Sequence, residues 1–128
     1  MTIEQLLRHL YEAFNKREME TILLFLHPAV QWANGLEGGF VYGHSALRRY
    51  WTKRFDIYRL HSEPLSFDQD DQGRTVVALR QIVSDLEGNV LKDRTIHHRF
   101  TITHGFIHRL EIDEIELRLS LPVGTGSK

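Results

Sequence analysis

His98 is the residue of this sequence whose predicted position would suit a general acid or base. In segment 90–103, Ile96, His98 and Phe100 alternate with polar residues, and this period of two predicts a strand that turns the imidazole toward an apolar face. Such an imidazole could act as general base or acid, because its ordinary pKa lies near neutral pH. A hydrogen-bonded core histidine would give the same pattern, so both interpretations stay open. His97 points to the opposite face and cannot share the site.

Arg80 and Gln81 are candidates for binding a substrate carbonyl or carboxylate. They lie in the neighbouring predicted strand, 74–85, and point to opposite faces of it. A three-residue hairpin loop at 86–88 would place Arg80 on the face of His98, whereas a slip by one residue would place Gln81 there. Both alternatives remain at this stage.

Aromatic residues with a polar atom are further candidates for the wall of a pocket. Tyr11, Trp32 and Trp51 fall on the apolar faces of predicted elements, and Asn34 follows Trp32 on the same face of a short strand. Buried tyrosine and tryptophan usually find a partner for the O–H or N–H group. Plain core packing is the more frequent role of such aromatic residues, and substrate binding is the second interpretation.

The sequence lacks the residue patterns of metal sites, nucleophilic catalysis and cofactor binding. The eight histidines are scattered, and only His98 and His108 could be diagonal neighbours, with no third ligand at a recognisable spacing. The sequence contains no cysteine, no serine nucleophile elbow, no phosphate-binding glycine loop and no dinucleotide fingerprint. We therefore predict neither a metal site nor a cofactor.

The composition is that of one ordinary globular domain over residues 1–128. Hydrophobic residues make up 41% of the sequence, and 16 Lys and Arg against 17 Asp and Glu leave a net charge of −1. A chain without a strong positive field is a poor nucleic-acid binder, and no run approaches the roughly 20 apolar residues that cross a membrane. The N-terminus also lacks the pattern of a signal peptide. We expect a cytoplasmic protein that binds neither nucleic acid nor membrane.

Three helices are predicted in the N-terminal half of the chain. Thr2 and Gln5 have the spacing of a capping box, and a helical apolar pattern follows as far as Phe14. A second helix of about two turns must stop near His27, because Pro28 disfavours helical geometry in the residue before it. The third helix starts at His44, and we interpret its basic residues as a solvated face; these are Arg48, Arg49, Lys53 and Arg54.

Strands follow the third helix. The segment after Tyr58 predicts an edge strand with a bulge at Pro64, and the runs 74–85, 90–103 and 106–113 predict a meander. A three-residue loop at 103–105 would pair His98 with Leu110, which keeps apolar residues on one face. Another apolar row alternates after residue 113, at Ile115, Leu117, Leu119 and Leu121. It predicts a bulged continuation of the last strand or an extra edge strand within 114–128, followed by a frayed tail, and it favours a homodimer.

This order of elements resembles the nuclear transport factor 2-like superfamily, which includes ketosteroid isomerase and SnoaL-like polyketide cyclases. The residues that carry the resemblance are Trp32, the Tyr42-Gly43-His44 entry to the third helix and the closing Gly105-Phe106-Ile107. The resemblance implies an α+β, cone-shaped barrel in which three N-terminal helices pack on a curved, mainly antiparallel sheet. It also implies an enclosed pocket and a homodimer.

The resemblance leaves the activity open. The position of the isomerase base falls near Trp32-Ala33-Asn34, where no carboxylate stands. We expect a protein with a pocket for a small apolar molecule. As an enzyme it would be a cofactor-independent isomerase, dehydratase, cyclase or hydrolase with His98 as acid or base. The alternatives are a non-catalytic ligand-binding module and an accessory or dimerisation domain.

Overall fold

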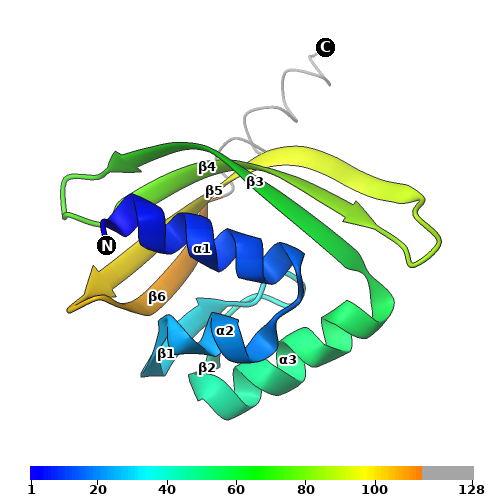
Figure 1. Cartoon of the computed structure of the whole chain (residues 1–128), viewed down its shortest axis with the longest axis horizontal. Helices are drawn as coiled ribbons and strands as arrows, with labels where there is room; N and C mark the ends of the chain where they lie inside the picture. The colour runs from blue at the N-terminus through cyan, green and yellow to red at the C-terminus, as the bar shows by residue number, and fades with distance from the viewer. Residues whose placement is uncertain (114–128) are drawn as a thin grey trace.

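The computed structural model describes residues 1–113, and the predicted extra strand and tail at 114–128 lie outside the described residues. Three helices lie together on one side of a sheet that curves over them (Figure 1). This arrangement confirms the predicted α+β fold. The elements in chain order are α1 (Ile3–Asn15), α2 (Met19–Leu24), β1 (Leu26–Ala33), β2 (Phe40–Tyr42), α3 (Gly43–Ile57), β3 (Arg59–Gln69), β4 (Thr75–Ser84), β5 (Val90–Thr103) and β6 (Phe106–Asp113).

The helices begin and end where the sequence predicts them within a few residues. Thr2 and Gln5 form the capping box of α1, with each side chain accepting a hydrogen bond from the backbone N–H of the other residue. Helix α2 ends at Leu24, before Pro28. Helix α3 begins at Gly43, whose positive φ of 80° is a conformation that glycine adopts without strain. No helix of the described residues is both long and apolar enough to cross a membrane.

The six strands form one mixed sheet in the order β2-β1-β6-β5-β4-β3. All neighbours are antiparallel except β1 and β6, which pair in parallel and bring Trp32 opposite Leu110. Strand β3 is an edge strand with a register shift between Pro64 and Ser66, which confirms the predicted bulge. The short strand β2 and the parallel pairing were not predicted.

The last hairpin differs from the predicted one. Thr103 faces Phe106, so the loop has two residues, His104 and Gly105, both with positive φ (54° and 80°). This is the backbone of a primed turn, whose twist matches that of the two strands. The predicted three-residue loop, and with it the pairing of His98 with Leu110, is therefore wrong.

A β-bulge in β6 keeps the apolar residues of β5 and β6 on one face, which was the reason for predicting the longer loop. Ile102 pairs with Ile107 and Thr101 with Arg109, which leaves His108 as the extra residue. Beyond this bulge Phe100 pairs with Leu110, and His98 pairs with Ile112. The hydrophobic pattern predicted the correct face, but the turn and the bulge together set the register.

The hairpin between β4 and β5 decides which candidate shares the face of His98. Val77 pairs with His98 and Gln81 with Arg94, so Gln81 lies on that face and Arg80 on the opposite one. The loop spans residues 85–89, with a register shift after Val83, instead of the three residues that would favour Arg80.

The hydrophobic core lies between the helices and the concave face of the sheet. Phe100 on β5 and Leu110 on β6 are fully buried against Leu7 and Leu10 of α1 and Leu47 of α3. Residues at alternate positions of β5 therefore face the helices. This face also carries the candidate site.

The two-residue turn yields a prediction for stability. Replacing Gly105 by valine forces a β-branched residue to a φ of +80° and should lower the free energy of unfolding by about 1–3 kcal/mol. Replacing His104 by asparagine, which tolerates positive φ better, should leave that free energy unchanged or raise it. Urea denaturation measures both changes. Equal destabilisation by the two substitutions would contradict the assigned turn.

Candidate functional site

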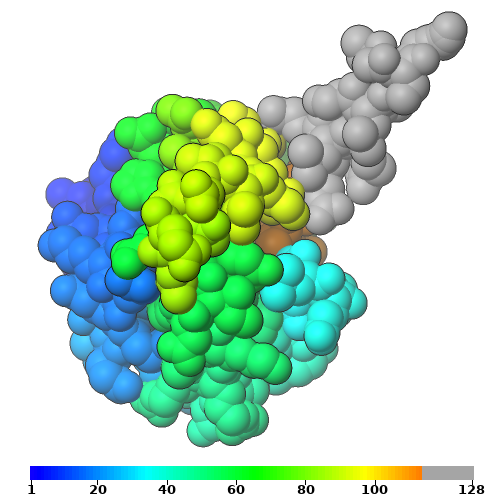
Figure 2. All heavy atoms as spheres, turned by 90° about the vertical axis from the view of Figure 1, so that its right-hand side faces the viewer, coloured from blue at the N-terminus to red at the C-terminus, as the bar shows by residue number. Residues whose placement is uncertain are grey.

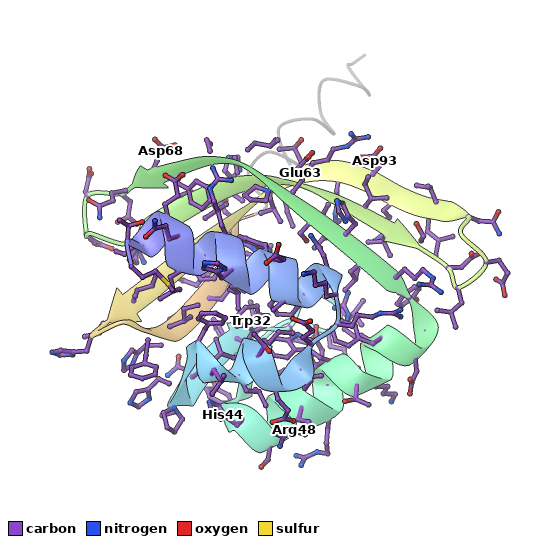
Figure 3. The ribbon with its side chains drawn as sticks, viewed as in Figure 1. Trp32, His44, Arg48, Glu63, Asp68 and Asp93 are labelled. Atoms are coloured by element: carbon purple, nitrogen blue, oxygen red, sulfur yellow. The ribbon has the colours of Figure 1, made fainter. Side chains whose placement is uncertain are left out.

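A cavity of about 240 Å³ lies between the helices and the sheet. Its inner wall is aromatic: the Trp51 ring is perpendicular to both Phe14 and Trp32, with ring centroids 4.8 and 4.9 Å away. Figure 3 shows Trp32 in the interior between the helices and the sheet. Trp32 and Trp51 are both buried, and their edge-to-face contact holds the two rings in place. The two indole rings therefore form a preorganised surface for an apolar molecule.

Tyr11 and His98 form a buried polar pair in the wall of this cavity. The Tyr11 hydroxyl lies 2.9 Å from Nδ1 of His98, and only 3% of Tyr11 and 8% of His98 are exposed. The two rings are stacked, with centroids 5.9 Å apart. The hydrogen bond joins α1 to β5, so the helix positions the imidazole.

Both members of the pair are neutral near neutral pH. Burial lowers the pKa of His98 from 6.5 to about 3, and the positive charge of Arg94 acts in the same direction. Burial raises the pKa of the Tyr11 hydroxyl well above its ordinary value. If Tyr11 donates to Nδ1, Nε2 carries the imidazole proton and is a donor; if Nδ1 donates to Tyr11, Nε2 is a free base. The pair can therefore give or accept one proton.

A group of three cations, here called the cationic rim, also lines the cavity: Arg54, Lys92 and Arg94. Arg54 donates from Nη1 to the Tyr50 hydroxyl at 2.7 Å, and Arg94 donates from Nη2 to Oε1 of Gln81 at 3.4 Å. Within residues 1–113, no aspartate or glutamate lines this cavity. The cavity is therefore positive at one part of its wall and apolar at another.

The sequence analysis missed the cationic rim. Arg54 belongs to the basic residues of α3 that we interpreted as solvated, yet it is half-buried against the cavity. Arg94 has the same alternation as Ile96 and His98, and this signal could have placed it on their face. Lys92 continues the same alternation toward the hairpin.

Most of the predicted site residues lie together. His98, Tyr11, Trp32, Trp51 and Gln81 all line the cavity, and whether they bind a substrate stays a prediction. They come from α1, β1, α3, β4 and β5, so the fold brings together residues that are far apart in the sequence.

Two predicted binding residues, Arg80 and Asn34, do not line this cavity. Arg80 lies on the opposite face of the sheet, half-exposed, with Nε and Nη2 donating to the two carboxylate oxygens of Asp93 at 2.9 and 2.6 Å. Figure 3 shows Asp93 on the outer side of the sheet, away from Trp32. Asn34 holds the loop that follows β1, because its Oδ1 accepts hydrogen bonds from the backbone N–H groups of Leu36 and Glu37, each at 3.0 Å.

The low pKa of His98 predicts a specific pH dependence of stability. Below pH 6.5 the unfolded chain takes up a proton at this residue, whereas the folded protein takes it up only near pH 3. The contribution of His98 is thus complete above pH 6.5 and is lost at about 1.4 kcal/mol per pH unit as the pH falls. Denaturation of the wild type and the His98→Gln variant at several pH values measures this loss. The difference between them should shrink as the pH falls, and a constant difference would contradict a buried neutral imidazole.

A comparison with known protein families finds a match over most of the chain. The model of the SnoaL-like domain matches residues 7–111. No functionally curated protein matches the sequence closely enough to be called a relative.

Solved structures of the same fold cover nearly the whole chain. TerC co-crystallized with polyporic acid has a TM-score of 0.73 and 22% identity, covering 94% of this chain and 97% of that one. An NTF2-like protein of unknown function from Burkholderia pseudomallei has a TM-score of 0.73 and 23% identity, covering 89% and 92%. A putative polyketide cyclase from Xanthomonas campestris pv. campestris has a TM-score of 0.74 and 20% identity, covering 91% and 93%. The helices on a curved sheet, the cavity between them and the match over residues 7–111 lead to one assignment: the chain belongs to the family of SnoaL-like domains, within the nuclear transport factor 2-like superfamily.

Proposed function

We propose that this protein is an enzyme that binds a small, largely apolar molecule in the cavity and moves a proton on it through the Tyr11–His98 pair. The observation that carries the proposal is the 2.9 Å hydrogen bond between these residues in a cavity wall that is otherwise mostly aromatic and aliphatic. A buried ionisable pair that borders a cavity is a frequent property of active sites.

The chemistry that fits is proton transfer next to a carbonyl group. With Nδ1 donating to Tyr11, Nε2 of His98 accepts a proton from the carbon next to the carbonyl, which leaves an imidazolium and an enolate. The imidazolium then returns the proton to another atom of the same molecule, so that protons and charge balance. This sequence isomerises the substrate, and the same proton transfers serve a dehydration or a ring closure.

The low pKa of His98 has two consequences for this mechanism. The imidazole is unprotonated at any pH well above 3 and is thus ready as a base, although a weak one. Its imidazolium is a correspondingly strong acid that returns the proton readily. The pair suits reactions in which a proton is removed and given back within one turnover.

The fold relatives support an organic molecule as the occupant. TerC was crystallised with polyporic acid, and several neighbours are described as putative polyketide cyclases. These names associate the fold with organic molecules, and we extend this association to the cavity of the present chain.

A second candidate function is binding without catalysis. It is favoured by the fact that, within residues 1–113, no carboxylate lines the cavity, whereas proton transfer in the isomerase branch of the superfamily uses one. A carrier or accessory domain would need only the apolar wall and the cationic rim.

Deuterium exchange tests the proposed proton transfer. A panel of aromatic ketones and 1,3-diketones is incubated with the protein in D₂O, and deuterium uptake at the carbon next to the carbonyl is followed by NMR. Wild type should accelerate exchange of at least one member, and His98→Ala should reduce the rate by about 100-fold or more, because the general base is lost. His9→Ala, which removes an exposed imidazole from α1, serves as the matched control and should exchange like wild type.

Melting temperatures of both variants show whether His98 is mainly structural. Undiminished exchange in His98→Ala would contradict its role as the base. Binding of panel members without any exchange in wild type would instead identify a binding protein.

A further inference from the structure

We infer that the natural ligand of the cavity is an anion: a small, flat, apolar molecule with one carboxylate or enolate group, held by Arg54 and Arg94. This inference rests on the proposed function, because it assigns the substrate class of the same site. It concerns recognition only and can be tested without turnover.

The charges of the cavity wall are the first argument. Arg54, Lys92 and Arg94 line one cavity, and no aspartate or glutamate of residues 1–113 lines it with them. Cations gathered in a cavity with low-dielectric walls attract an anion more strongly than the same cations on an open surface.

The hydrogen-bond partners of the two arginines are the second argument. Both partners are neutral: the Tyr50 hydroxyl for Arg54 and the Gln81 amide oxygen for Arg94. Several arginines outside the cavity pair with carboxylates instead, namely Arg8, Arg48, Arg74, Arg80, Arg99 and Arg109. The fold thus neutralises arginines elsewhere, but residues 1–113 supply no anion at the cationic rim.

The third argument is that the Nε atoms of Arg54 and Arg94 are buried without a hydrogen-bond partner. Nε of Arg99 is buried in the same way, but it lies 3.5 Å from the Asp70 carboxylate, whereas the two cavity arginines have no such neighbour within the described residues. A buried charged donor without a partner is costly. A carboxylate bound to the planar fork of a guanidinium accepts two hydrogen bonds and neutralises the charge of the whole group.

Burial along the cavity sets the orientation of the ligand. Trp32 and Trp51 are buried, Arg54 and Arg94 are half-buried, and Lys92 is exposed. Figure 2 shows the β4–β5 hairpin meeting the end of α3 and the loop after β1 on one face of the molecule. The anionic group would therefore lie near this face, with the apolar body against the aromatic wall that includes Trp32 and Trp51. At about 240 Å³ the cavity is near the small end of ligand sites, which suits a bicyclic acid.

Binding of 2-naphthoate and its neutral analogue 2-naphthamide tests the inference. Affinities are measured by titration calorimetry, with quenching of tryptophan fluorescence as a second readout. Naphthoate should bind about tenfold more tightly than naphthamide or better, as expected for a charged hydrogen-bonded pair. Arg54→Gln and Arg94→Gln should each weaken naphthoate binding about tenfold while changing naphthamide binding by less than about twofold.

The control variant is Arg49→Gln, which removes the same charge from the exposed side of α3. It should bind both probes like wild type. Arg94→Lys keeps the charge but loses the two-pronged geometry, and its affinity for naphthoate should lie between those of wild type and Arg94→Gln. Melting curves show which variants are folded, and this series keeps the test informative if one substitution unfolds the protein.

Three results would overturn the inference: no binding of naphthoate at millimolar concentration, equal affinity for the two probes, or equal losses in Arg94→Gln and Arg49→Gln. Failure of the proposed function looks different, because a protein that selects naphthoate but exchanges no proton in D₂O remains an anion-binding domain. A protein that exchanges protons on neutral ketones without preferring anions keeps the function and loses the inference.

Discussion

The hydrogen bond between Tyr11 and His98 joins the first helix to an interior strand of the sheet at the wall of an unfilled cavity. Each group would be costly to bury alone, since an unsatisfied polar group costs about 1–3 kcal/mol. Paired, they satisfy one another and stay neutral near neutral pH, because burial lowers the pKa of the imidazole to about 3. The interior can therefore contain an ionisable pair with no carboxylate of residues 1–113 in the cavity wall. The helices can also close over the sheet without filling the space between them.

Strand β5 carries the other residues of the site in a row that runs from the surface to the core. Lys92, Arg94, Ile96, His98 and Phe100 occupy alternate positions and face the helices, at intervals of about 7 Å along the strand. The strand thus runs from an exposed cation through the ionisable pair to a fully buried phenyl ring. In the binding mode that we propose, Arg94 fixes the polar end of a ligand and the apolar residues of the wall contact its other end. Recognition and the proposed proton transfer would then occupy neighbouring positions of one rigid element, which keeps their spacing constant.

The sequence predicts elements better than the contacts between them. Local signals such as the capping box at Thr2 and the bulge at Pro64 act within a few residues, and the structure confirms both. Register depends on turns and bulges that leave weak local signals, so neither the two-residue turn nor the bulge at His108 was predicted. The same difficulty left Arg80 and Gln81 undecided. The cationic rim was missed because Arg54 comes from a helix whose other basic residues are exposed, and only the folded chain brings it to the cavity of Arg94.

The protonation state of His98, with and without a bound molecule, most directly tests the claim that a neutral imidazole borders the cavity. Nitrogen-15 NMR of the labelled imidazole near neutral pH distinguishes a neutral ring from an imidazolium and identifies which nitrogen carries the proton. We predict a neutral ring in the free protein and a change in the His98 nitrogen shifts on saturation with 2-naphthoate, because the ring borders the occupied cavity. An imidazolium in the free protein, or shifts that stay the same while the ligand saturates, would contradict the account.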